Sequence, residues 1–182
     1  MDTEIYSLSQ VPYPQALRWQ RKRKVLRAKG LCNDTLLLME HPPIYTAGRA
    51  TQIEDLSEKT LHEIIEVERG GSVTFHGPGQ LICYFVIDLK KGKKDIRKFI
   101  SILEKTIIDT LKSYNINTFA DKKNVGIWYN DNSQIKKVAA IGIKVSKWIA
   151  YHGFSINIKN NLDDYKKIIP CGLENKKITS LK

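Results

Sequence analysis

A cysteine and a lysine, each in an unusual local sequence, could together carry out acyl transfer. Cys171 lies between Pro170 and Gly172, and Lys137 precedes a stretch of small and apolar residues, 138–143. A thiolate is a strong nucleophile, and a neighbouring cation or base can generate it from the thiol. The glycine-rich segment 69–80 could supply backbone N–H groups that stabilise an oxyanion. These residue types predict acyl transfer through a thioester.

Both residues also have an ordinary structural interpretation. A lone cysteine is usually a small buried hydrophobic residue, and this is how we interpret Cys32 and Cys83. Cys171 differs because a proline restricts the backbone before it and a glycine frees the backbone after it, which predicts a turn that presents the sulfur. Lys136 and Lys137 both follow a polar turn and could be solvated. Since neighbouring strand residues face opposite sides, we expect one to point outward and the other into a cleft.

The segment 69–80 contains four glycines, one proline and several polar side chains. It has neither the residue order of a phosphate-binding loop nor that of a dinucleotide-binding loop. Thr74, His76 and Gln80 predict a polar wall, in which His76 is a base, an orienting group or a hydrogen-bonding side chain. His152 fits a satisfied core residue and a pocket wall equally well. The four histidines lack metal-ligand spacing, so we expect no metal and no other cofactor.

Length and composition favour one domain of a cytoplasmic protein. The chain has 182 residues, of which 42% are hydrophobic and 27% charged, which is ordinary for a globular domain. No apolar run approaches the roughly 20 residues of a membrane span, and residues 1–4 do not resemble a signal peptide. An odd, sparse set of three cysteines indicates a reducing compartment. We therefore expect no membrane contact.

The formal charge of +11 has three interpretations. The first is a compositional bias toward lysine, isoleucine and asparagine. The second is a basic face that docks an acidic macromolecule. The third is nucleic-acid binding, but the aromatic residues do not combine with the basic ones in an RNA-binding motif. We therefore expect no nucleic-acid partner.

Hydrophobic periodicity predicts two helices among many strands. Pro14 suits the first turn of a helix over residues 14–28, with Ala16, Leu17, Val25 and Leu26 inward, and Gly30 suits its end. Residues 95–114 carry an apolar stripe at helical spacing. We expect strands at 4–8, 35–39, 44–46, 64–68, 81–89, 125–129, 137–145 and 148–158, with a polar turn at 130–133 and a helical turn at 163–167. This pattern predicts an α+β or a mixed-sheet α/β domain, and we favour α+β, with mixed sheets and flanking helices.

Taken together, six segments resemble the lipoyl(octanoyl) transferase family, the octanoyl-(acyl carrier protein)–protein N-octanoyltransferases. They occur in family order at residues 40–49 (Glu-His-Pro-Pro-Ile-Tyr-Thr-Ala-Gly-Arg), 69–80 with Tyr84 and 88–89, 137–142, 152–157 (His-Gly-Phe-Ser-Ile-Asn), 170–173 and 179–181. Each segment alone is weakly specific, but six in order are strongly specific. The chain departs from the family pattern at Phe85, where members often have proline. It also stops just past residue 181, where relatives commonly continue, which leaves two interpretations: a missing C-terminal helix, or a short member of the family.

The resemblance implies an enzyme of lipoate biosynthesis with the fold of biotin and lipoate protein ligases, in a single catalytic domain over residues 1–182. Such an enzyme moves octanoyl, or lipoyl, from acyl carrier protein to a lysine of lipoyl domains, which belong to the E2 subunits of 2-oxoacid dehydrogenases and to the glycine cleavage H protein. The family's thioester cysteine falls on Cys171 and its partner lysine on Lys137. Its acyl-binding residues fall on Arg69, Gly70, Gly71, Ser72, Val73, Thr74, Phe75, His76, Ala140, Ile141, Gly142, Gly153, Phe154 and Ser155.

Two other functions remain open from the sequence. An ATP-dependent lipoate or biotin protein ligase would work through an acyl-adenylate and would need no cysteine. A non-catalytic basic binding module would use the positive charge alone.

Overall fold

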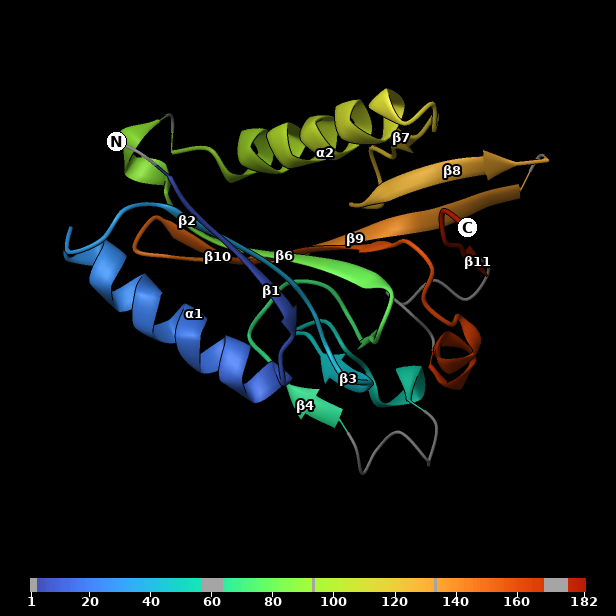
Figure 1. Cartoon of the computed structure of the whole chain (residues 1–182), viewed down its shortest axis with the longest axis horizontal. Helices are drawn as coiled ribbons and strands as arrows, with labels where there is room; N and C mark the ends of the chain where they lie inside the picture. The colour runs from blue at the N-terminus through green and yellow to red at the C-terminus, as the bar shows by residue number, and fades with distance from the viewer. Residues whose placement is uncertain (1–2, 57–63, 93, 133, 169–176) are drawn as a thin grey trace.

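A mixed eight-stranded sheet lies at the centre of the computed structural model, which describes residues 3–56, 64–92, 94–132, 134–168 and 177–182 (Figure 1). Most neighbouring strands are antiparallel; β1 with β2 and β9 with β11 are the parallel pairs of the described sheet. The strands run in the order β1 (Glu4–Gln10), β2 (Thr35–Glu40), β6 (Gln80–Asp88), β10 (Ile149–Asn157), β9 (Gln134–Ser146), β8 (Ile127–Asp131) and β7 (Phe119–Ala120), and β11 (Lys177–Ile178) pairs with β9.

A second sheet of three short strands lies against one face of the large sheet (Figure 1). Its central strand β3 (Ile44–Ala47) is parallel to β4 (Ile64–Glu66) and antiparallel to β5 (Thr74–His76). Short 3-10 helices follow at η1 (Ile53–Asp55), η2 (Leu89–Lys91) and η3 (Asp163–Lys167). Strand β5 lies inside the glycine-rich segment, where the sequence analysis placed only a loop.

Helix α1 (Tyr13–Ala28) packs on the face of the large sheet formed by β6 and β10. Pro14 occupies its first turn, and Gly30 follows its end at a φ of 75°, a conformation that glycine adopts without a steric penalty. Ala16 and Leu17 are buried as predicted, but Val25 is 49% exposed and the prediction that it faces inward is wrong. Arg27 is buried at this end instead, where its guanidinium pairs with the carboxylates of residues 34 and 88.

Helix α2 (Ile96–Ser113) covers the opposite face of the large sheet (Figure 1). The carboxylate of Asp95 accepts a hydrogen bond from the Lys98 N–H and caps the helix, as aspartate does at this position. Leu103, Ile107 and Leu111 form the buried side of the helix. Each fully buried aliphatic side chain contributes about 1.5–3 kcal/mol, so this stripe is enough to fix the helix on the sheet.

The two faces of the large sheet follow the alternation of side chains along its strands. On β6, Tyr84 packs beneath α1 and Phe85 packs beneath α2.

Strands β8 and β9 extend further toward their connection than predicted, because β8 ends at Asp131 and β9 begins at Gln134. The other predicted strands and the helical turn at 163–167 are present with small shifts in their bounds. In the part of the chain that the structure describes, no helix is long and apolar enough to cross a membrane.

Candidate active site

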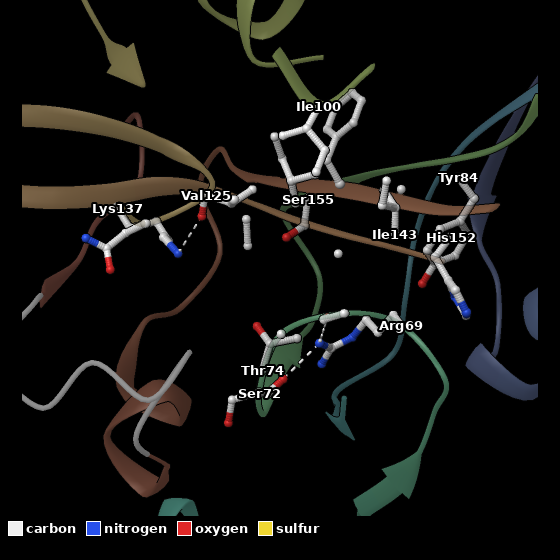
Figure 2. Close-up of a pocket in the computed structure, with 18 of the residues that line it drawn as sticks. Arg69, Ser72, Thr74, Tyr84, Ile100, Val125, Lys137, Ile143, His152 and Ser155 are labelled. Carbon is white, nitrogen blue, oxygen red and sulfur yellow. Dashed lines mark hydrogen bonds between the residues drawn. The ribbon is translucent and has the colours of Figure 1, made fainter. Parts of the chain in front are cut away.

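A cavity of about 510 Å³ lies between strands β9 and β10 of the large sheet and the glycine-rich segment that leads into β5 (Figure 2). A cavity of this size is in the range of small-molecule sites. Small residues of β9 and β10 leave its floor open, since Gly142 pairs with Gly153 and Ala140 pairs with Ser155. The cavity is lined by Tyr13, 69–72, Thr74, His76, Tyr84, Ile96, Ile100, 123–125, Lys137, 140–143 and 152–155.

Lys137 lies at one end of the cavity with its amine in a nearly dry position. Its side chain is 4% exposed, and Nζ donates to the carbonyl of Val125 at 3.1 Å. The amine also lies 4.8 Å from the centre of the Trp128 ring, where a cation is attracted to the π face. Lys136 points the other way and pairs with Asp131, as strand alternation predicts. A buried lysine is costly unless it is used, which makes Lys137 a candidate for chemistry.

Arg69 fastens the glycine-rich segment against the small sheet. Its Nη1 donates to the carbonyls of Gly70 (3.0 Å) and Ser72 (2.8 Å), and its Nη2 donates to the carbonyl (2.8 Å) and hydroxyl (2.9 Å) of Thr46. The N–H of Gly70 donates to the carbonyl of Ile143 at 2.9 Å, which ties the segment to β9. These bonds fix the wall of the cavity opposite the large sheet.

Glycines in this wall allow backbones to approach closely. A Cβ on Gly48 would lie 2.2 Å from the carbonyl oxygen of Gly71, and a Cβ on Gly142 would lie 3.1 Å from the Arg69 side chain. Larger residues at these positions would push the wall away or fill the cavity. Glycine is therefore needed at these two positions so that the chain can pack closely around the cavity.

His76 is a buried, neutral hydrogen-bonding wall of the cavity. Its Nδ1 is 2.7 Å from Gln80 Oε1, and the Gln80 amide donates to Asn157 Oδ1 and to the Tyr165 hydroxyl, both at 2.8 Å. Burial lowers the pKa of His76 to about 3. Among the roles left open by the sequence, this arrangement favours the hydrogen-bonding wall over a general base.

A second polar cluster, of which Tyr13 and Tyr84 line the cavity, lies beside β6. His41 Nε2 is 2.9 Å from the Tyr84 hydroxyl, and Nδ1 contacts the carbonyl of Val11 at 2.5 Å. The Tyr13 ring lies beside both, with centroids 5.2 Å from His41 and 6.4 Å from Tyr84. Burial lowers the pKa of His41 and raises that of Tyr84, so this cluster is neutral.

His152 lies at the end of the cavity away from Lys137 (Figure 2). The side chain is 2% exposed, and its backbone has a φ of 65°. Burial, helped by the nearby Arg69 cation, lowers its pKa to about 3. Of the two interpretations that the sequence left open, the structure supports the pocket wall.

The structure brings most of the sequence-predicted binding residues to this one cavity. Exceptions are Val73 and Phe75, which point into an apolar cluster with Tyr45 and Tyr165, because strand β5 alternates and presents Thr74 and His76 to the cavity instead. Cys171 lies outside the described residues. The sequence did not predict several residues that line the cavity: Tyr13, Tyr84, Ile96, Ile100 and 123–125. They come from distant elements, and no local pattern marks them.

The fold and the cavity place the chain in a known class of catalytic domain. The lipoyl protein ligase A/B catalytic domain family matches residues 12–182. Lipoate-protein ligase A bound with ATP superposes with a TM-score of 0.74 at 14% identity, covering 100% of this chain and 76% of that one. Biotin protein ligase from Aquifex aeolicus superposes with a TM-score of 0.52 at 16% identity, covering 100% and 58%. The expected α+β, biotin/lipoate protein ligase-like fold is therefore confirmed.

Sequence relatives narrow this class to one family. The octanoyltransferase of Bartonella tribocorum is 44% identical over 179 residues, covering 93% of this chain and 73% of the relative. The octanoyltransferase of Ehrlichia ruminantium (strain Gardel) is 41% identical over 187 residues, covering 100% and 88%. The chain belongs to the octanoyltransferase family, and the resemblance drawn from its six segments is confirmed.

Proposed function

We propose that this protein transfers an octanoyl group from acyl carrier protein to a lysine of a lipoyl domain through a thioester on Cys171, with residues 1–182 acting as one catalytic domain. The observation that carries the proposal is the buried amine of Lys137 at one end of a cavity floored by small residues. A cation in such a site is suited to generating and holding a thiolate.

Chain connections near Lys137 support Cys171 as its partner. Ile178 of β11 pairs with Lys137, and the N–H of Thr179 donates to the Lys137 carbonyl at 2.9 Å. Ile168 belongs to the same apolar cluster as Ile178, so the chain before segment 169–176 ends in a cluster that reaches the strand paired with Lys137. The other two cysteines are poor candidates, because neither Cys32 nor Cys83 lines the cavity and burial raises the pKa of Cys83 to about 12.

The reaction has two balanced steps. In the first, the Cys171 thiolate attacks the carbonyl carbon of the octanoyl thioester, a new C–S bond forms, and the pantetheine sulfur leaves and takes up a proton. In the second, the acceptor lysine's ε-amine attacks the acyl-enzyme, loses a proton to Lys137 or to water, and the Cys171 thiolate leaves. Because a thioester is exchanged for a thioester and then for an amide, no ATP is required.

The cavity supports selection of a medium acyl chain. Its wall and floor near Gly142 are made of Gly70, Gly71, Ala140 and Ser155, and these small residues leave room for a slot that holds an acyl chain along the sheet. Burying an eight-carbon chain at about 0.8 kcal/mol per CH₂ contributes roughly 5 kcal/mol. One methylene more or less changes the rate by roughly 10-fold to 200-fold in such a pocket. The donor is then octanoyl–acyl carrier protein, and the acceptors are lipoyl domains of E2 subunits and the glycine cleavage H protein.

A reconstituted transfer assay tests this function. The purified protein is mixed with octanoyl–acyl carrier protein and an unmodified lipoyl domain, with and without ATP, and the mass of the lipoyl domain is followed. Octanoylation that does not depend on ATP supports the proposal. Product that forms only with ATP and free octanoate would identify a ligase, and no product under either condition would favour a binding module.

Lys137→Met should reduce the rate of this transfer at least 100-fold, because it removes the buried amine while keeping a similar chain length. Lys136→Met is the matched control, since it removes an amine from the neighbouring, outward-facing position. If both variants transfer octanoyl at the wild-type rate, Lys137 has no part in the chemistry.

A further inference from the structure

His152 carries an unusual combination of burial and unused hydrogen-bonding capacity. The side chain is 2% exposed, and neither ring nitrogen has a hydrogen-bond partner among the residues that the structure describes. Buried polar side chains are nearly always hydrogen-bonded, so such a group in a native fold calls for an explanation. The Gln20 amide nitrogen next to it is buried and also lacks a partner within the described chain.

The backbone bends at His152 to place the ring in the cavity. Along β10, Tyr151 packs on the α1 face of the sheet, whereas Ala150 and Phe154 pack on the α2 face. Strand alternation would send residue 152 to the α2 face. Instead, φ is 65° and the ring stacks on Tyr151 with centroids 4.7 Å apart.

Neighbouring residues hold this strained conformation. The Gln20 side chain accepts a hydrogen bond from the His152 N–H at 3.1 Å. Gly153 is required next to it, because a Cβ there would lie 1.8 Å from the Cys83 carbonyl oxygen. Left-handed backbone at a residue other than glycine costs of order 1–3 kcal/mol and is concentrated at functional sites. The backbone conformation that places this imidazole in the cavity therefore lowers the stability of the fold.

The imidazole lies where the far end of an acyl chain would arrive. A Cβ on Gly126 would lie 3.4 Å from Lys137 Nζ and 2.7 Å from the Ala139 carbonyl oxygen, so the amine and that carbonyl lie on opposite sides of one small gap in β9's neighbourhood. His152 pairs with Ile143, four residues further along β9, or about 13 Å at about 3.3 Å per residue.

An extended octanoyl group matches this span. It measures about 9 Å from its seven C–C bonds of about 1.5 Å. With its carbonyl in contact with the amine at about 3.5–4 Å, the terminal carbon comes level with Ile143 and His152.

We propose that His152 is a specificity-determining residue at the end of the acyl slot away from Lys137, where its ring hydrogen-bonds a hydroxyl on the terminal carbon of a medium acyl chain. The neutral imidazole has one nitrogen that donates and one that accepts, and a hydroxyl can satisfy either. The inference rests on the proposed function, because it places the reacting carbonyl beside Lys137. It extends that function to ω-hydroxy medium-chain acyl thioesters as a substrate class.

The test compares two acyl groups of equal length on acyl carrier protein: 8-hydroxyoctanoyl, which ends in a hydroxyl, and nonanoyl, which ends in a methyl group at the same position. The wild-type protein should transfer 8-hydroxyoctanoyl with a kcat/KM about tenfold higher than nonanoyl, the discrimination expected of one hydrogen bond. His152→Phe keeps a ring but removes both nitrogens, so the preference should be lost or reversed.

A second variant keeps the test decisive if His152→Phe does not fold. Asparagine tolerates left-handed backbone better than phenylalanine, so His152→Asn should fold, and its shorter side chain should also abolish the tenfold preference. Equal or faster transfer of nonanoyl by the wild type, or a preference unchanged in the variants, would overturn the inference.

A binding measurement separates this inference from the proposed function. Calorimetric titration of the wild-type protein with 8-hydroxyoctanoate and with nonanoate requires no transfer activity. Tighter binding of the hydroxy acid, by about tenfold, supports the role of His152 even if no octanoyl transfer occurs. Equal binding contradicts that role even if octanoyl transfer is fast.

Discussion

Mild acid should destabilise this protein well before its carboxylates are protonated. Burial lowers the pKa of both His76 and His152 to about 3, whereas an unfolded histidine has a pKa of about 6.5. Below that value the unfolded chain takes up protons that the folded chain cannot bind. The stability contributed by these neutral rings is therefore complete above pH 6.5 and is lost progressively as the pH falls toward 3.

The size of the effect follows from the difference in pKa. Protonation of one histidine stabilises the unfolded state by about 1.36 kcal/mol for each pH unit below 6.5, and pH 5 lies roughly 1.5 units below that value. This amounts to about 2 kcal/mol for each histidine and about 4 kcal/mol for His76 and His152 together. Such a change is a large fraction of the stability of a typical domain.

Urea unfolding at pH 7 and pH 5 measures this difference. The midpoint should fall with an unchanged m-value. In the double variant His76→Gln, His152→Asn, most of the difference between the two pH values should disappear, whatever the variant's absolute stability. Equal unfolding free energies of the wild type at pH 7 and pH 5 would refute the conclusion that both rings are buried in neutral form.

Three further predictions concern the site and the charge. Gly142→Ala should lower kcat/KM for octanoyl transfer about tenfold, because the added Cβ would lie 3.1 Å from the Arg69 side chain and narrow the slot; wild-type kinetics would show that the slot does not pass Gly142. Lys137→Met should slow iodoacetamide alkylation of Cys171 at neutral pH while Lys136→Met changes little, and equal rates would exclude Lys137 as the activator. Raising salt from about 50 to about 500 mM should lower kcat/KM for octanoyl–acyl carrier protein several-fold but barely affect a small neutral octanoyl thioester; an equal response to both donors would make the +11 charge compositional.

The sequence predicts most of the fold because its local signals agree with the tertiary structure. Apolar residues at helical spacing identify α2, and a proline followed later by a glycine brackets α1. The exposure of Val25 and the burial of Arg27 were not predictable from α1 alone. Two carboxylates from other elements pair with Arg27 at that end of the helix, and this pairing is a tertiary effect.

The candidate site was predictable where its residues are consecutive and not where distant elements meet. The glycine-rich segment and the Lys137 strand stand out in the sequence, and both line the cavity. Tyr13 reaches the cavity from the start of α1 and carries no local signal. Side chains alternate along β5, so that Phe75 points away from the cavity. The sequence did not reveal this alternation, because the strand is only three residues long. The orientation of His152 depends on a single left-handed residue, which strand periodicity cannot reveal.

Intact-mass measurement of the protein after mixing with octanoyl–acyl carrier protein, without an acceptor, tests the thioester mechanism most directly. The thioester mechanism predicts a gain of one octanoyl group that maps to Cys171, is removed by neutral hydroxylamine, and is absent in Cys171→Ser but retained in Cys32→Ser and Cys83→Ala. Octanoyl transfer to the lipoyl domain by Cys171→Ser at a substantial rate, or an octanoyl group on another residue of the wild type, would contradict it.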